Sequence, residues 1–345
     1  MMTKKNKKIL IISVCAVIAV VAAGAITAKL LFGNILKNEQ AVYVYIDQDD
    51  DIDSVCAKID EVAQPSTLKG FRMLASWKDY DQHIRTGRYE IKPDMSIVEV
   101  FRMLRNHQQV PVNLVVPSVR TLDQLSARLS AKLMIDSLTI AQKLSDEASI
   151  KELGFTHETF PALFIPNTYE VNWDISADEL LKRMAREYKA FWTEERQAKA
   201  KAQQLSQTEV ATLASIIDSE TAYTPEKPTV AGLYLNRLRT NMLLQSDPTV
   251  IFAIGDFSMR RVLNSDLQVE SPYNTYKYKG LPPGPIRIPS VSALDAVLNP
   301  VEHDYIYMCA KEDFSGSHNF ATTYNEHLAN ARRYTKALNE RGIKR

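Results

Sequence analysis

An uncharged run near the N-terminus sets the first constraint on how this chain can fold. No charged residue occurs from Ile9 to Ala28, and a helix of that length, at about 1.5 Å per residue, matches the ~30 Å hydrocarbon core of a membrane. Four lysines precede the run, at positions 4, 5, 7 and 8, and such a basic flank predicts a cytoplasmic N-terminus. We expect residues 1–8 to form a cytoplasmic basic tail and 9–29 a single transmembrane anchor. The rest of the chain is then expected outside the cytoplasmic membrane.

Two processing alternatives compete with an uncleaved anchor. Ala23-Gly24-Ala25 could serve as a signal-peptidase site, but the apolar region of a signal peptide runs only about 7–15 residues and this one is longer. The segment from Ile12 to Cys15 faintly resembles a lipoprotein box, yet Val14 is a poor residue before the cysteine and the apolar run continues past it. The uncleaved anchor is the better interpretation.

Composition narrows the class of protein. The chain has 345 residues, a formal net charge of +1 and 24% charged residues, so neither a nucleic-acid surface nor a disordered charged tail is indicated. Its three cysteines are too few for a disulfide framework and lack zinc-site spacing, although a single Cys56–Cys309 bridge stays possible. We expect no metal, no cofactor and no nucleic-acid partner.

The first part of the chain after the anchor, residues 30–109, reads as a small α/β subdomain. A strand is predicted at Val42–Ile46, two short helices up to Trp77 with a break at Pro65–Thr67, a strand after Gly87 and an amphipathic helix at Ile97–Leu104. This alternation resembles a LysM-like carbohydrate-binding module. A packing or spacer domain is an equal alternative.

Residues 110–345 read as a larger mixed α/β domain, which makes the fold class α+β. A proline-bounded strand is predicted within Val110–Pro117 and helices over 121–148. Strand and turn are predicted at Phe160–Val171, followed by one long charged helix from Ala177 toward Gln204.

A helix that begins after Ser206 carries the main candidate for catalysis. Ser206 and Glu209 have the spacing of a capping box. At 100° per residue Val210, Leu213, Ala214 and Ile217 share one face, and Glu220 falls between Leu213 and Ile216. A carboxyl placed there loses hydration, so its pKa should rise toward that of a general acid. Asp218 falls on the opposite edge among small residues and should stay ionised. The alternative is that Glu220 faces water at a frayed helix end.

Two stretches of loop sequence suit the recognition of a sugar. Gln245–Val250 places an amide, a hydroxyl and a carboxylate beside a proline, and prolines also pin the chain between Pro272 and Pro289. Tyr, Asn, Thr and Gln beside a carboxyl can stack on sugar faces and bond to hydroxyl groups. The sequence contains no Walker loop, no Gly-x-Ser-x-Gly elbow and no His-x-x-x-His pair.

Taken in order, these motifs resemble the endolytic murein transglycosylase family, also called YceG-like, over roughly residues 85 to 340. The residues that carry the resemblance are Ala214–Thr221, Asn236–Leu238, Gln245–Val250, Tyr273–Tyr276, Gly280–Ile286, Leu298–Pro300 and Gly316–Phe320. The family usually has two glutamates around one residue, the second being catalytic, and here these positions are Asp218 and Glu220. The chain departs from the family at Asn167, where an aspartate is common, so no carboxylate role is expected there.

The resemblance implies a catalytic domain over 110–345 that cuts the β-1,4 bond between N-acetylmuramic acid and N-acetylglucosamine within peptidoglycan strands. Glu220 would act as the single acid and base and leave a 1,6-anhydro end, ending the elongation of nascent strands. Peptidoglycan synthases, the penicillin-binding proteins, are the expected partners. The residues expected to contact substrate are Gln245, Asp247, Tyr273, Asn274, Tyr276 and His318. The alternatives are a muramidase-type hydrolase that uses Asp218 or Asp247 as second carboxylate, and a non-catalytic scaffold that binds glycan.

Overall fold

The computed structural model describes residues 4–37, 39–64, 68–259 and 261–341. Its contacts divide the chain into two compact units. Unit 1 comprises residues 1–113, 132–134 and 170–175, and unit 2 comprises 114–131, 135–169 and 176–345. The main division falls between Asn113 and Leu114, and the domain bounds expected from the sequence stay a prediction.

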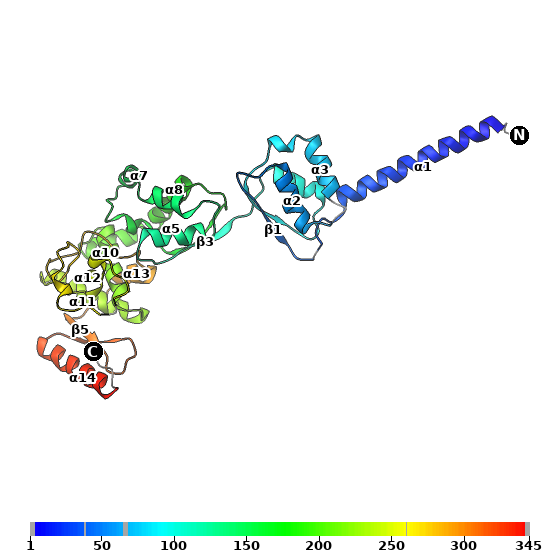
Figure 1. The fold of residues 1–345 in the computed structure, drawn as a ribbon. Helices are drawn as coiled ribbons and strands as arrows, with labels where there is room; N and C mark the ends of the chain where they lie inside the picture. The colour runs from blue at the N-terminus through cyan, green and yellow to red at the C-terminus, as the bar shows by residue number, and fades with distance from the viewer. Residues whose placement is uncertain (1–3, 38, 65–67, 260, 342–345) are drawn as a thin grey trace. The chain divides into compact units, whose positions relative to one another are not determined.

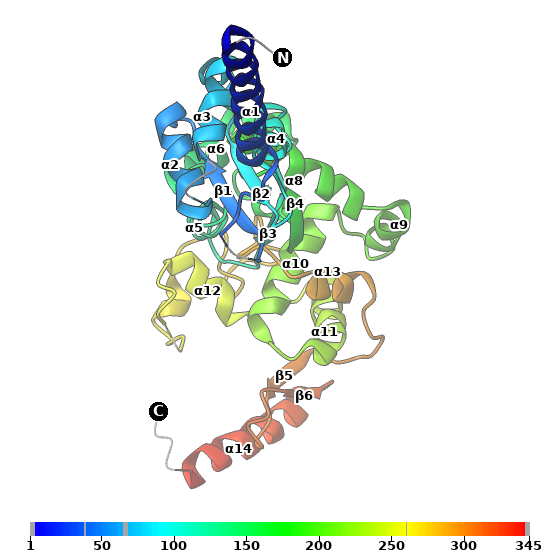
Figure 2. The ribbon, with the colours of Figure 1, turned by 90° about the vertical axis from the view of Figure 1, so that its right-hand side faces the viewer.

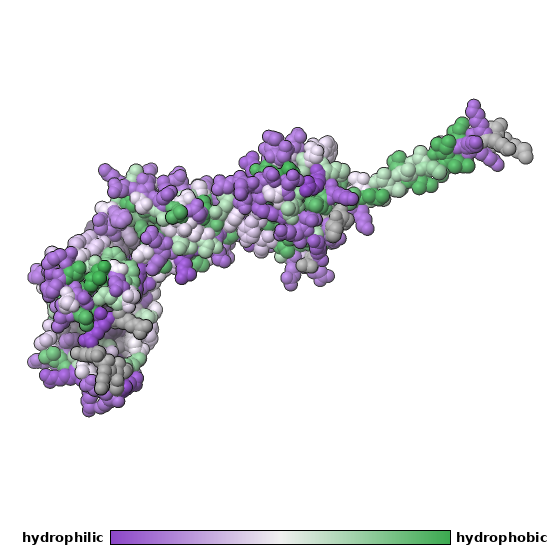
Figure 3. All heavy atoms as spheres, in the orientation of Figure 1, coloured by the Kyte–Doolittle hydropathy of each residue, from purple (hydrophilic) through white to green (hydrophobic). Residues whose placement is uncertain are grey.

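The N-terminal segment is a single long helix, α1 (Lys4–Phe32). The most apolar 18-residue window within its residues 5–32 has a mean hydropathy of 3.0, and none of that window is buried against the protein. Figure 3 shows the hydrophobic side chains running along this helix, with hydrophilic ones at its N-terminal end. By length and composition α1 can cross a membrane.

The rest of unit 1 is a small α/β fold with its own core. Its elements are β1 (Val42–Ile46), α2 (Ile52–Val62), α3 (Leu68–Trp77), β2 (Gly87–Ile91) and α4 (Ile97–Arg105). β1 and β2 pair antiparallel with Val44 opposite Tyr89, and both side chains are buried. The strands and helices predicted from the sequence are present, whereas the break at Pro65–Thr67 lies outside the described residues. The LysM-like assignment stays a prediction.

The first half of unit 2 differs from expectation at one helix. Its elements are β3 (Val112–Val116), α5 (Leu122–Ser130), α6 (Ser137–Leu144), α7 (Glu147–Glu152), β4 (Asn167–Val171), α8 (Ala177–Phe191) and α9 (Glu194–Ala202). The strands β3 and β4 pair with each other. The single charged helix expected from Ala177 toward Gln204 is two helices. Trp192 is buried between them, and Thr193 caps α9 by accepting from Arg196 N.

The second half of unit 2 is built around α10 (Gln207–Glu220), which packs against α9 and three later helices. The remaining elements are α11 (Lys227–Arg239), α12 (Asp247–Ile254), α13 (Val291–Leu298), β5 (Tyr307–Ala310), β6 (His318–Ala321) and α14 (Tyr324–Glu340). Figure 1 shows α10, α11 and α13 together, and Figure 2 shows α14 beside the antiparallel β5–β6 pair. Cys309 in β5 and Cys56 in α2 are free thiols, so the possible bridge between them is not formed.

The capping box predicted for α10 is present, but the helix is buried on more than one face. Ser206 and Glu209 cap it reciprocally. Every residue from Val210 to Ile217 is buried, including Thr212 and Ser215, whose hydroxyls donate to backbone carbonyls one turn earlier. Burial of each large apolar side chain here contributes about 1.5–3 kcal/mol. This helix is therefore the central element of unit 2, and its last residue is Glu220.

Candidate active site

The end of α10 places Glu220 against two hydroxyl groups from later in the chain. Tyr234 Oη donates to Glu220 Oε1 at 2.7 Å, and Ser246 Oγ donates to the same oxygen. Tyr234 lies on α11 and is buried, and Ser246 is the fully buried residue that precedes α12. Thr221 ends the helix in an extended conformation, with φ −136° and ψ 130°. The carboxyl is thus enclosed by protein while the residue keeps some solvent-accessible surface.

Burial dominates the acidity of this carboxyl. Desolvation raises the pKa of Glu220, and the hydrogen bonds from Ser246 and Tyr234 oppose this because they stabilise the carboxylate. The negative charge of Asp247 raises the pKa further, and His318 lowers it. The net direction is upward, as the helical pattern predicted. A carboxyl whose pKa is raised keeps its proton to higher pH than an exposed glutamate, and such a group suits the donation of a proton to a leaving group.

Three of the other predicted site residues gather around Glu220. Tyr276 Oη donates to Asp247 Oδ1 at 2.5 Å, and the charge of Glu220 contributes to the raised pKa of Tyr276, whose largest cause is burial. His318 begins β6, where Glu226 accepts from its backbone N at 2.7 Å and lies 2.8 Å from its Nδ1. Asp247 is exposed. Glu220, Asp247, Tyr276 and His318 therefore form one polar cluster, which we call the acid cluster.

The remaining three predicted residues lie in different settings. Asn274 is fully buried: its amide donates to Leu267 O and Val269 O, both at 2.9 Å, and its Oδ1 accepts from Tyr276 N. It holds the loop and presents no free group to a sugar. Tyr273 packs on Phe252, with ring centroids 4.7 Å apart, in a separate cavity. Gln245 is exposed, with a left-handed φ of 49° that turns the chain before Ser246.

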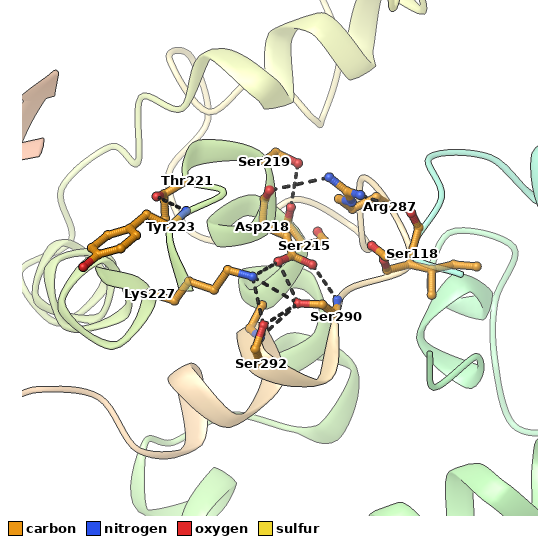
Figure 4. A network of polar contacts seen from close by, with 12 residues as sticks. Ser118, Ser215, Asp218, Ser219, Thr221, Tyr223, Lys227, Arg287, Ser290 and Ser292 are labelled. Atoms are coloured by element: carbon orange, nitrogen blue, oxygen red, sulfur yellow. Dashed lines mark hydrogen bonds and ion pairs between the residues drawn. The ribbon is translucent and has the colours of Figure 1, made fainter. Parts of the chain in front are cut away.

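Asp218 lies in a second polar network, whose hydrogen-bond partners differ from those of Glu220 (Figure 4). Lys227 Nζ lies 2.5 Å from Asp218 Oδ1, and each side chain is 6% exposed. Ser290 donates its backbone N to Oδ2 and its hydroxyl to Oδ1, and Ser292 accepts from Lys227. The helical pattern placed only small residues around Asp218, and that was wrong because Lys227 and Ser290 arrive from outside the helix. This buried ion pair ties the end of α10 to the starts of α11 and α13.

A second contact from α10 holds the proline-rich loop. Ser215 Oγ accepts from Ile286 N at 2.9 Å, and both residues are buried. The Asn236–Leu238 motif also acts on backbone: Asn236 donates to His303 O, and Arg237 donates to Ile306 O at 2.7 Å and to Leu244 O. Ser215, Asn236 and Arg237 therefore hold backbone groups of other segments, and Glu220 is the member of the α10 motif that belongs to the acid cluster.

Two residues that contact Glu220 were not predicted as site residues. Ser246 stands between the predicted Gln245 and Asp247, and its place before a proline-initiated helix was a usable signal. Tyr234 stands inside α11, where a buried tyrosine must find a partner for its hydroxyl. Among the described residues, no group of three or more His, Cys, Asp or Glu side chains is placed to hold a metal ion.

Fold and site together define a class: an α+β protein with an N-terminal apolar helix and one enclosed carboxyl of raised pKa at the end of a buried helix. The chain belongs to the YceG-like family, whose model matches residues 44–333. It is similar to the endolytic murein transglycosylase of Bacillus subtilis (strain 168), with 28% identity over 300 residues that cover 80% of this chain and 82% of that protein.

Two further comparisons agree with this family. The endolytic murein transglycosylase of Streptococcus pneumoniae serotype 2 (strain D39) is 27% identical over 275 residues, which cover 70% of this chain and 49% of that protein. The chain thus spans about half the length of that relative. A 2.6 Å crystal structure of a YceG-like protein from Listeria monocytogenes has a TM-score of 0.55 and 25% identity, covering 85% of this chain and 99% of the other.

Proposed function

We propose that this chain cuts the β-1,4 bond between N-acetylmuramic acid and N-acetylglucosamine within peptidoglycan strands, with Glu220 as its acid. Its family's curated relatives are named endolytic murein transglycosylases, which makes the chain an enzyme of the lytic transglycosylase class, a lyase. The observation that carries the residue assignment is the enclosed Glu220 carboxyl, whose pKa is raised and whose Oε1 is held by two hydroxyls.

The proposed reaction returns its proton to the same carboxyl. Protonated Glu220 gives its proton to the glycosidic oxygen as the bond from that oxygen to the muramyl C1 breaks. The muramyl 6-hydroxyl then attacks C1, and the Glu220 carboxylate takes the hydroxyl proton, leaving a 1,6-anhydro end. Because the attacking hydroxyl belongs to the same sugar, its effective concentration is high and no second carboxylate is needed to activate water. Tyr234 and Ser246 orient the carboxyl by holding Oε1.

A muramidase-type hydrolase is the second candidate, and one observation favours it. Asp247 is an exposed carboxylate close enough to Glu220 to raise its pKa, so it could activate a water molecule. Asp218 does not serve this candidate, because it is paired with Lys227. The products separate the two reactions. Digestion in H₂¹⁸O should give anhydro ends without the label, whereas labelled reducing ends would establish hydrolysis.

The test of Glu220 is its exchange for Gln in the full chain in detergent, scored by anhydro-muramyl ends. General acid catalysis contributes about 10²–10⁴-fold, so the variant should lose at least that much activity. Asp218→Asn should lose much less, provided both variants are compared at equal folded fraction. A Glu220→Gln protein with full activity would remove the acid assignment. A variant that loses activity yet restores a deletion strain would favour the scaffold alternative.

We also propose that α1 anchors the enzyme in the cytoplasmic membrane with its N-terminus in the cytoplasm. On the outer side, cleavage of nascent strands would end their elongation by partner peptidoglycan synthases. The apolar α1 and the preceding lysines support this topology. Protease added to spheroplasts should digest the chain from about residue 33 onward, and its complete protection would contradict the orientation.

A further inference from the structure

A cavity of about 450 Å³ in unit 2 is separate from the acid cluster. It opens where the proline-rich loop meets the start of α5 and the end of α12. Its apolar lining is buried or half-buried and includes Leu144, Pro161, Phe252, Tyr273 and Pro285. A concave, mostly apolar space of this size with a few polar groups is the usual form of a ligand site.

The walls of this cavity are fixed by close backbone packing. A Cβ added at Gly284 would lie 2.0 Å from Glu158 O, so the loop passes directly over that segment and only glycine fits. The Phe252 and Tyr273 rings pack against one another, with their centroids 4.7 Å apart. The cavity is therefore already formed before a ligand binds, which lowers the entropic cost of binding.

Charged side chains of both signs stand at the exposed rim. Arg120 donates a hydrogen bond from its Nη1 to Phe257 O at 3.3 Å, and its guanidinium lies over the Phe257 ring. Asp123, in the first turn of α5, and the exposed His157 also line the cavity. Glu158, which also lines the cavity, lies near enough to Tyr273 to add to the rise of the tyrosine's pKa to about 12, for which burial is the larger cause. A rim with a cation and two carboxylates suits a zwitterion better than an uncharged sugar.

Short contacts connect the cavity wall to the acid. Tyr273 is followed by Asn274 and Thr275, and Thr275 Oγ1 accepts from Ser246 N at 3.0 Å. The hydroxyl of Ser246 donates to Glu220. A ligand in the cavity and a sugar at Glu220 would therefore bind to adjoining parts of one loop.

We propose that this cavity binds the peptide stem attached to the muramic acid of the strand being cut, with a stem carboxylate at Arg120 and a stem amine at Glu158. This inference rests on the proposed function. It makes the enzyme selective for strands that still carry their peptides, because the stem adds binding that a bare strand lacks.

The direct test measures binding without turnover. Full-length Glu220→Gln protein in detergent is titrated by equilibrium dialysis with a radiolabelled muramyl tetrapeptide that contains a diamino acid. Adding Arg120→Gln should weaken binding at least about tenfold, as expected for the loss of a charged hydrogen bond. Arg128→Gln, the same exchange at an exposed position of α5, serves as the control. Equal binding by the two variants, or none by the parent protein, would overturn the proposal.

Two further comparisons separate this inference from the proposed function. Glu158→Gln should weaken binding of the peptide with a free amine but not binding of the N-acetylated peptide. Equal weakening of binding for both peptides would contradict the amine contact. In turnover, the unmodified enzyme should prefer peptide-bearing strands over strands stripped by an amidase. If it cuts both equally, the cavity proposal fails and the proposed function stands. If it cuts neither, the proposed function fails and the dialysis result alone decides the cavity.

Discussion

The exchange Lys227→Met tests whether the buried ion pair with Asp218 holds the end of α10. Methionine fills nearly the same space but removes the ammonium group. The Asp218 carboxylate would then keep its bonds from Ser290 and the longer-range attraction of Arg287 but lose its ion-pair partner, with the Asp218 and Lys227 side chains each only 6% exposed. Breaking a buried pair in this way costs about 3–5 kcal/mol, since one charge stays buried and uncompensated. For a domain of unit 2's size, this corresponds to a fall in Tm of about 6–20 °C.

The assay is thermal unfolding of the full chain in detergent, followed by tryptophan fluorescence. Lys199→Met is the matched control because Lys199 forms an exposed pair with Glu195 at 2.7 Å, and such pairs contribute about 0–1 kcal/mol. The double variant Asp218→Asn with Lys227→Met should recover much of the loss, since no orphaned charge remains. Equal shifts for Lys227→Met and Lys199→Met, or a double variant worse than the sum of its parts, would refute this account of the network.

Three further predictions concern Glu220 and the loop. Tyr234→Phe removes a bond that lowers the pKa of Glu220, so the alkaline limb of the kcat/KM profile should move to higher pH, whereas Asp247→Asn should move it to lower pH; shifts in the same direction would contradict this. Because the folded-state pKa of Glu220 is raised, its contribution to stability is present below the unfolded pKa of about 4.3 and is lost as pH rises through the folded pKa. Glu220→Gln should therefore raise Tm at pH 8 more than at pH 4. The same change in Tm at both pH values would argue against burial as the cause of the raised pKa. Gly284→Ala should destabilise by about 1–3 kcal/mol through its clash with Glu158 O, measured as Tm against Gly24→Ala, where no atom lies within 4 Å.

Local signals made α10 and the raised pKa of Glu220 predictable. The Ser206 and Glu209 cap, the apolar spacing and the position of Glu220 all lie within one helix, so a helical projection was enough to predict the rise in pKa. The same projection failed for Asp218, because its partners Lys227 and Ser290 lie outside the helix. A projection shows which face a side chain occupies and says nothing of what covers that face.

The loop residues show a different limit. A polar side chain in a rigid loop looks the same in sequence whether it faces a ligand or holds its own backbone. Asn274 uses its amide inside the loop, whereas Tyr276 reaches Asp247 in the acid cluster. The break between α8 and α9, by contrast, could have been predicted from the sequence, because Thr193 followed by two glutamates is an N-cap signal inside the charged stretch.

The bonds at the end of α10 also differ in how far along the chain their partners lie, which bears on the order of folding. Glu220 reaches Tyr234 and Ser246, only 14 and 26 residues away, whereas Asp218 and Ser215 reach Ser290 and Ile286, 72 and 71 residues away. Contacts of short sequence separation close smaller loops and form sooner. The Glu220 carboxyl can therefore form its hydrogen bonds with Tyr234 and Ser246 while the chain beyond α12 is still being synthesised. The network around Asp218 then locks this arrangement once α13 arrives.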